Sequence, residues 1–65
     1  MSEFIAIQIK VCEDTIRRME HAQKQRREAD FDLEKIKLLE VLAILKTTDF
    51  STYSKYSKYG EMTFS

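Results

Sequence analysis

The chain has 65 residues, 43% of them hydrophobic, and its 11 Lys and Arg balance its 11 Asp and Glu to a formal net charge of zero. A neutral chain has no overall electrostatic attraction to nucleic acid or to an anionic membrane surface. With a single cysteine and no run of about 20 apolar residues, the sequence excludes an internal disulfide and predicts no transmembrane helix.

A chain of this length is one domain at most, which we assign to residues 1–65. So small a domain buries only about 60% of the surface of its unfolded chain, and many such domains are stabilised by metals or by oligomerisation. Cys12 and His21 do not make up the usual ligand set of a structural metal, so we expect no metal, no cofactor and a homo-oligomer. The start, Met1–Ser2–Glu3, lacks the basic segment of a signal peptide, which favours a cytoplasmic location.

Two secondary structures fit the first segment. Apolar side chains recur at spacings of four and three, as on the buried face of a helix: Ile5, Ile9, Cys12, Ile16 and Met19. Over residues 3–11 alone, β-branched side chains also alternate at every second position, as in a strand: Ile5, Ile7, Ile9 and Val11. We predict a helix over about 3–28, because the helical spacing continues to Met19 and charge pairs such as Glu13 and Arg17 stand four residues apart.

The strand interpretation stays open as the alternative, with a strand over 3–11 followed by two helices. That order is similar to the topology of ribbon-helix-helix proteins, small dimers whose strand side chains enter the major groove of DNA. The similarity would place Ala6, Gln8 and Lys10 on the side that faces DNA. The chain departs from that family because it has no glycine between the two helical segments and no excess of basic residues.

The second segment is apolar on almost every side of a helical wheel, and we predict a helix over about 31–47. Its apolar side chains are Leu33, Ile36, Leu38, Leu39, Val41, Leu42, Ala43, Ile44 and Leu45. A helix of this kind is buried on most of its faces, and one short chain has too few other residues to cover so much apolar surface. We therefore expect copies of the chain to pack into a helical bundle. The predicted interface between copies comprises Ile5, Ile9, Cys12, Ile16, Met19, Leu38, Leu42 and Leu45.

The distribution of charge marks a turn between the two segments. Residues 17–27 contain five cations and one acid, whereas residues 28–40 contain five acids and two cations. Cations favour the C-terminus of a helix and acids favour the N-terminus. We expect a break near Ala29–Asp30, with Asp30 or Asp32 as the N-cap of the second helix. The predicted fold is therefore an all-α, two-helix antiparallel hairpin rather than one continuous rod.

A tail over residues 48–65 follows a polar run, Thr47 to Asp49, that is expected to end the second helix. The tail contains a three-residue repeat of aromatic and basic side chains: Tyr53, Lys55, Tyr56, Lys58 and Tyr59. The three-residue period places the tyrosines on roughly one side of either a short helical or 3₁₀ turn or an extended polyproline-like segment. Because tyrosine has an apolar ring and a polar hydroxyl, we expect the tail to pack on the open end of the bundle. As an alternative, bases stack on the rings while the lysines bind phosphates.

A basic cluster near the end of the first helix is the second candidate surface: Arg17, Arg18, Lys24, Arg26 and Arg27. Its members either pair with the acids of the next helix or contact phosphate or an acidic protein. No set of side chains matches a catalytic motif, and Cys12 on the apolar face is expected to be a buried, unreactive thiol. We therefore expect no enzymatic activity.

These features favour a small interaction protein, an oligomer that binds and modulates or inhibits another protein, as accessory proteins of phages and plasmids do. This expectation is based on the small size, the neutral charge, the surplus apolar surface and the absence of catalytic motifs. The alternative is binding of nucleic acid or a nucleotide through the Arg17–Arg27 cluster or the Tyr53–Tyr59 repeat. No association with membranes is expected.

Overall fold

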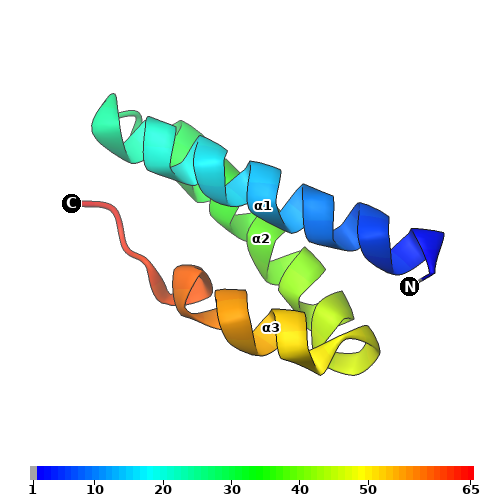
Figure 1. Ribbon diagram of the computed structural model, residues 1–65. Helices are drawn as coiled ribbons and strands as arrows, with labels where there is room; N and C mark the ends of the chain where they lie inside the picture. Colours follow the sequence, from blue (N-terminus) through cyan, green and yellow to red (C-terminus); the bar gives the residue numbers. More distant parts are fainter. Residues whose placement is uncertain (1) are drawn as a thin grey trace.

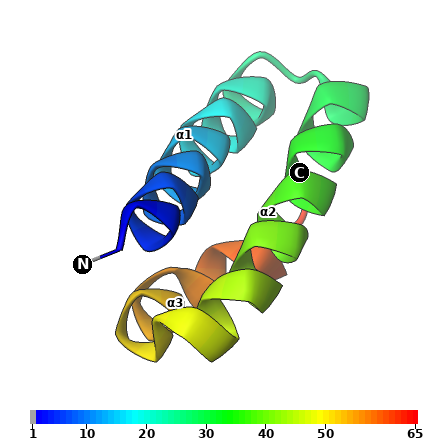
Figure 2. The ribbon, with the colours of Figure 1, turned by 90° about the vertical axis from the view of Figure 1, so that its right-hand side faces the viewer.

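A computed structural model describes residues 2–65 and contains four helical elements in chain order. They are the long helices α1 (Glu3–Lys24) and α2 (Glu28–Thr48), the short helix α3 (Phe50–Tyr56) and the 3₁₀ helix η1 (Ser57–Glu61). α1 and α2 form an antiparallel hairpin, and α3 turns back beside α2 (Figures 1 and 2). The predicted all-helical hairpin with a docked tail is therefore confirmed.

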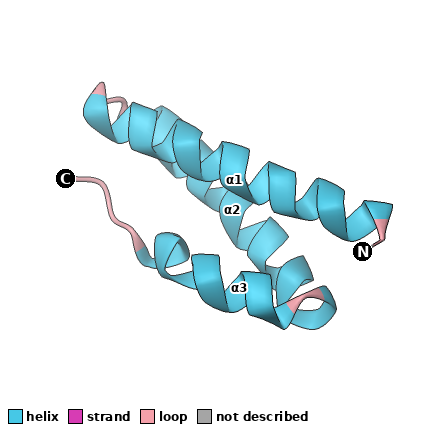
Figure 3. Cartoon of the chain, in the orientation of Figure 1, coloured by secondary structure: helices cyan, strands magenta, loops and turns pink. Residues whose placement is uncertain are grey.

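The first segment is helical throughout. Residues 3–11 lie inside α1, and Figure 3 shows no strand within residues 2–65. Ser2 is the N-cap, and its hydroxyl accepts a hydrogen bond of 3.2 Å from the backbone N–H of Ile5. The strand alternative, and with it the similarity to ribbon-helix-helix proteins, is wrong. The helix prevails because its four-and-three spacing turns one continuous face toward α2, with Cys12, Ile16 and Met19 all buried.

The turn between α1 and α2 comes four residues earlier than expected, because α1 ends at Lys24 and not near residue 28. Arg26 adopts a left-handed conformation, with φ of 57°. The N–H of Arg27 donates to the carbonyl of Ala22 at 2.9 Å, and the N–H of Arg26 donates to that of Gln23 at 3.2 Å. These two bonds make a Schellman motif, which closes a helix by satisfying its last carbonyl groups.

The start of α2 also differs from the sequence-based expectation. The helix begins at Glu28, and its N-cap Arg27 makes no side-chain capping bond. Asp30 is already inside the first turn and pairs with the guanidinium of Arg27 at 2.6 Å, so the expected N-cap at Asp30 or Asp32 is wrong. The acids at this end still favour the helix, since they lie near the positive end of its dipole.

The end of α2 lies within the predicted polar run. Asp49 follows the last residue, Thr48, and serves as the N-cap of α3. Its carboxylate accepts hydrogen bonds from the backbone N–H of Thr52 at 3.3 Å and from the hydroxyl of Thr52 at 2.6 Å. One aspartate therefore separates two helices and sets the direction in which the tail leaves α2.

The hydrophobic core lies between the two long helices and under the tail. α1 contributes Cys12, Ile16, Met19 and Ala22, and α2 contributes Phe31, Leu38, Val41, Leu42 and Leu45. Half-buried side chains packed against this core are Ile9, Tyr53, Tyr56, Tyr59, Met62 and Phe64. Five of these six belong to the tail, so the tail covers one face of the hairpin and completes the core within a single chain.

Long-range contacts hold the tail along the hairpin. The rings of Phe64 and Phe31 meet edge to face, with centroids 5.7 Å apart. Ser65 bonds through its hydroxyl to the amide of Gln23 at 2.7 Å, near the α1–α2 turn. At Gly60 the η1 backbone approaches α2 so closely that a Cβ atom there would lie 3.0 Å from Leu42 Cδ1. The tail is thus a packed element of the fold.

Candidate interaction surfaces

Most residues of the predicted interface between copies lie inside a single chain. Six of the eight are buried: Cys12, Ile16, Met19, Leu38, Leu42 and Leu45. The other two, Ile5 and Ile9, are half-buried. Because these side chains already contact one another or the tail, a second copy would need to use apolar residues that the monomer leaves exposed. Self-association itself stays a prediction.

Among residues 2–65, eight large apolar side chains stay exposed: Phe4, Ile7, Val11, Leu33, Ile36, Leu39, Ile44 and Phe50. A single exposed leucine or valine is ordinary, but exposed apolar residues that adjoin on one face mark a binding surface. By helical spacing most of these eight fall into two groups. The α1 strip comprises Phe4, Ile7 and Val11, and the outer face of α2 comprises Leu33, Ile36, Leu39 and the exposed Ala43.

The α1 strip lies on the side of the hairpin that the tail leaves open. Its members stand three and four residues apart, so they share one face of α1. Arg18 continues the same face, seven residues after Val11, and reaches across to Glu34 of α2. Phe4, Ile7 and Val11 remain 53%, 52% and 40% exposed, although each carries a large apolar side chain.

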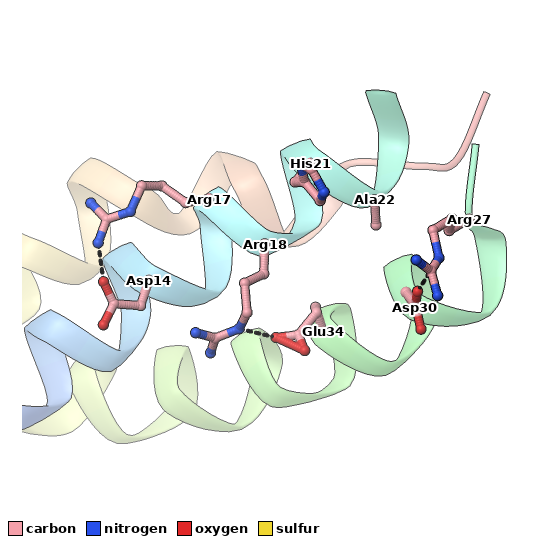
Figure 4. A pocket seen from close by; sticks show the side chains of 8 residues that line it. All are labelled: Asp14, Arg17, Arg18, His21, Ala22, Arg27, Asp30 and Glu34. Carbon is pink, nitrogen blue, oxygen red and sulfur yellow. Dashed lines mark hydrogen bonds and ion pairs between the residues drawn. The ribbon is translucent and has the colours of Figure 1, made fainter. Parts of the chain in front are cut away.

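A polar pocket of about 390 Å³ opens between the end of α1 and the start of α2 (Figure 4). Its lining is Asp14, Arg17, Arg18, His21, Ala22, Arg27, Asp30 and Glu34. Each of the three arginines is paired with a carboxylate: Arg17 with Asp14, Arg18 with Glu34 at 2.7 Å, and Arg27 with Asp30 at 2.6 Å. The pocket therefore has little net charge, because each guanidinium already has a carboxylate partner.

The ion pairs of the three arginines distinguish the two arrangements expected for the basic cluster. Arg18 and Arg27 pair with acids of α2. This is the first of the two arrangements expected for the cluster, pairing with the acids of the next helix. Within residues 2–65, Lys24 and Arg26 form no ion pair and are exposed on the surface near the turn. The cluster thus presents two unpaired cations rather than five.

Glu34 is a site residue that the sequence analysis did not single out. Its side chain is buried at the α1–α2 contact, where Arg18 donates to it at 2.7 Å and Lys37 at 3.3 Å. Burial acts to raise the pKa of this carboxyl, but the two hydrogen bonds and positive charges outweigh burial and lower the pKa below its ordinary 4.5. The sequence feature that could have identified Glu34 is its position three residues after Phe31 and four before Leu38, on the core side of α2.

The tyrosine repeat is folded onto the hairpin. Tyr53, Tyr56 and Tyr59 are all half-buried, as the packing interpretation predicted. The hydroxyl of Tyr56 donates to Glu13 of α1 at 2.6 Å, and this bond, together with burial, raises the pKa of Tyr56 to about 12. Tyr56 therefore stays protonated at neutral pH and ties the tail to α1.

The lysines of the repeat lie over its aromatic rings. The ammonium of Lys55 is 5.2 Å from the ring centre of Tyr56, and that of Lys58 is 5.4 Å from the ring centre of Tyr59. Such cation–π contacts occupy the ring faces on which nucleic acid bases would stack. The arrangement favours packing of the tail over base recognition.

A second hollow, the α2–tail groove, separates α2 from α3 and η1 and has a volume of about 470 Å³. The groove is lined by the apolar residues Leu39, Leu42, Ala43 and Gly60 and by charged residues of both signs, Lys46, Lys58 and Glu61. At Gly60 the tail backbone approaches Leu39 and Leu42 closely, and the exposed Ala43 carries only a small side chain at the groove. The groove adjoins the outer face of α2 because the two share Leu39 and Ala43.

Within residues 2–65, Cys12 is not a reactive thiol and no metal centre is formed. Burial raises the pKa of the Cys12 thiol to about 11, with a further rise from the charge of Glu13, so this thiol is protonated and enclosed at neutral pH. Residues 2–65 contain no group of three or more His, Cys, Asp or Glu placed to hold a metal ion. In the same part of the chain, none of the helices has both the length and the apolarity needed to span a bilayer.

Comparison of the chain with models of protein families, with curated proteins and with solved structures found no match. The geometry of the surfaces is therefore the basis for assigning a function. Those surfaces are the α1 strip, the outer face of α2 with its adjoining groove, and the polar pocket whose charges are internally paired.

Proposed function

We propose that this protein is a non-enzymatic interaction module that binds another protein through the α1 strip and also associates with itself. The observation that carries the proposal is the exposure of Phe4, Ile7 and Val11 on one face of α1, beside a core that the tail has already closed. Folding of the monomer gains nothing from leaving this face apolar. Binding of a partner would remove the apolar face of α1 from water.

The geometry of the strip favours a partner with an apolar ridge, such as one face of an amphipathic helix. Three apolar side chains over two helical turns form the kind of ridge that helix-to-helix contacts use. Full burial of an apolar side chain contributes about 1.5–3 kcal/mol, and aromatic anchors such as Phe4 contribute most at interfaces. The flanking pair Lys10 and Asp14, 3.6 Å apart, gives the strip a polar rim with no net charge.

A site-specific crosslinking experiment tests the proposal. The photoreactive residue p-benzoylphenylalanine is placed at position 7 in the strip or at position 20, where Glu20 lies on the other side of α1. In lysate of the native cells, we expect one protein to crosslink from position 7 and not from position 20. The captured protein is then assayed with and without the chain, because modulation or inhibition is the expected consequence of binding.

Matched substitutions separate specific binding from general stickiness. Ile7→Ser removes the centre of the strip without touching the core, since Ile7 is 52% exposed, and Glu20→Ser alters a polar site on the same helix. Ile7→Ser is expected to weaken binding of the captured protein by at least about tenfold, whereas Glu20→Ser leaves it unchanged. Equal binding by the two variants would contradict the proposal.

A further inference from the structure

We infer that a second copy of this chain docks antiparallel on the outer face of α2, where Ile36 of each copy enters the α2–tail groove of the other. This inference rests on the proposed self-association and is independent of partner binding through the α1 strip. It assigns an occupant to the groove and a role to the exposed apolar half of α2.

A projecting side chain and a hollow lie on the same face of one helix, α2. Ile36 is 57% exposed, and Ala43, which borders the groove, follows it by seven residues, or about two helical turns. When the two-fold axis passes between Leu39 and Glu40, Ile36 of one copy lies opposite Ala43 of the other. A two-fold interface requires just this self-complementarity, because each copy supplies both the projection and the hollow.

Charged residues at the two ends of this face favour the same docking. On the same face, Asp32 precedes Ile36 by four residues, and Lys46 follows Ala43 by three. The antiparallel arrangement places Asp32 of each copy near Lys46 of the other, at both ends of the contact. Parallel docking would place like charges together, so the charges select the antiparallel orientation.

Within residues 2–65 neither Asp32 nor Lys46 is engaged in an ion pair, and both are exposed. Lys46 lies 5.8 Å from the ring centre of Tyr53 at the edge of the groove, where Lys58 adds a second positive charge. An acidic side chain that arrives with Ile36 therefore meets two lysines, Lys46 and Lys58, against one acid of the lining, Glu61. A second copy of this chain carries that acid at the required spacing.

Charge reversal provides the decisive test, using the full chain and sedimentation equilibrium to measure association. The wild-type chain is expected to reach twice its 7.7 kDa mass in the high micromolar range. Asp32→Lys and Lys46→Glu are each expected to weaken association by at least about tenfold, because each places like charges together at both ends. An equal mixture of the two variants is expected to recover it, since both ends of a mixed dimer then pair an acid with a lysine.

Two further variants keep the result interpretable. Ile36→Ser should abolish the dimer, whereas Ile7→Ser should leave the dimer intact and affect only partner binding, so failures of the two proposals can be told apart. Circular dichroism checks that every variant stays helical. A wild-type mass of 7.7 kDa throughout, a dimer that Ile36→Ser retains, or a mixture of charge variants that stays monomeric would each overturn the inference.

Discussion

The carboxylate of Glu34 lies between the two long helices, where Arg18 and Lys37 keep it ionised. Its pKa is lowered in the folded chain, so its contribution to stability is present above the ordinary pKa of 4.5 and is lost as the pH falls below that value. Glu34→Gln is expected to lower the free energy of unfolding by about 1 kcal/mol at neutral pH, a small value because Arg18 is half exposed to solvent.

Urea unfolding at pH 7 and pH 3 measures this effect of Glu34. The difference between wild type and Glu34→Gln should shrink at pH 3, because below the ordinary pKa of 4.5 the unfolded chain binds a proton at Glu34 that the folded ion pairs must displace. Asp14→Asn is a suitable control, because it changes a more exposed carboxylate that pairs with Arg17 within α1 alone. A difference that stays constant between the two pH values would show that the ion pair is not what stabilises the hairpin.

The hydroxyl of Tyr56 reports on the docking of the tail at alkaline pH. Its folded pKa, raised from 10 to about 12, means that the bond to Glu13 stabilises the fold fully below pH 10 and is lost as the pH rises through 12. We expect tyrosinate absorbance to show one tyrosine ionising near pH 12, and Tyr56→Phe to remove that step. Glu13→Gln should move it toward pH 10, since the carboxylate is the main cause of the shift. A titration unchanged by both variants would contradict the observed contact.

At the level of secondary structure elements, the turn at Gln25–Arg27 is held by a non-glycine residue in a left-handed conformation. Arg26 has φ of 57°, which costs an L-amino acid roughly 1 kcal/mol or more. Arg26→Gly relieves that cost but gives the unfolded chain more freedom, so we expect a net gain of about 0.5 kcal/mol in the free energy of unfolding. Gln25→Gly is the control: with φ of −86°, it should destabilise the chain. Denaturant midpoints of the two variants moving in the same direction would refute this account.

The same turn shows what the sequence could and could not predict about the elements. Both long helices followed from apolar spacing, and the antiparallel hairpin followed from the charges that flank the turn. The position of the turn did not follow, because glycine usually marks the left-handed residue of a Schellman motif and here that residue is Arg26. Asp30 resembled an N-cap by residue type alone, whereas its carboxylate pairs with Arg27 from within the first turn.

At the level of the whole molecule, the docked tail determines which apolar side chains a single chain covers by itself. Cys12, Leu38 and Leu42 were expected to meet a second copy, because two helices alone cannot cover them. The tail supplies the missing cover, with Tyr53, Met62 and other half-buried side chains packed on the core. Periodicity identifies the apolar faces of a helix, but it does not indicate which of those faces the same chain will cover.

The distribution of charge over the whole molecule argues against the alternative function, nucleic acid binding. Three of the five basic-cluster residues are paired with carboxylates, and Lys55 and Lys58 lie over tyrosine rings. With Lys24 and Arg26 as the cluster's free cations, we expect weak binding to single-stranded DNA or RNA and a slope of log affinity on log salt no steeper than about −2. Fluorescence anisotropy over a salt series measures that slope. The control is the double variant Lys55→Ala and Lys58→Ala, which should leave the weak binding unchanged. A steep slope that this variant reduces would instead assign phosphate recognition to the tyrosine repeat and make the tail the functional surface.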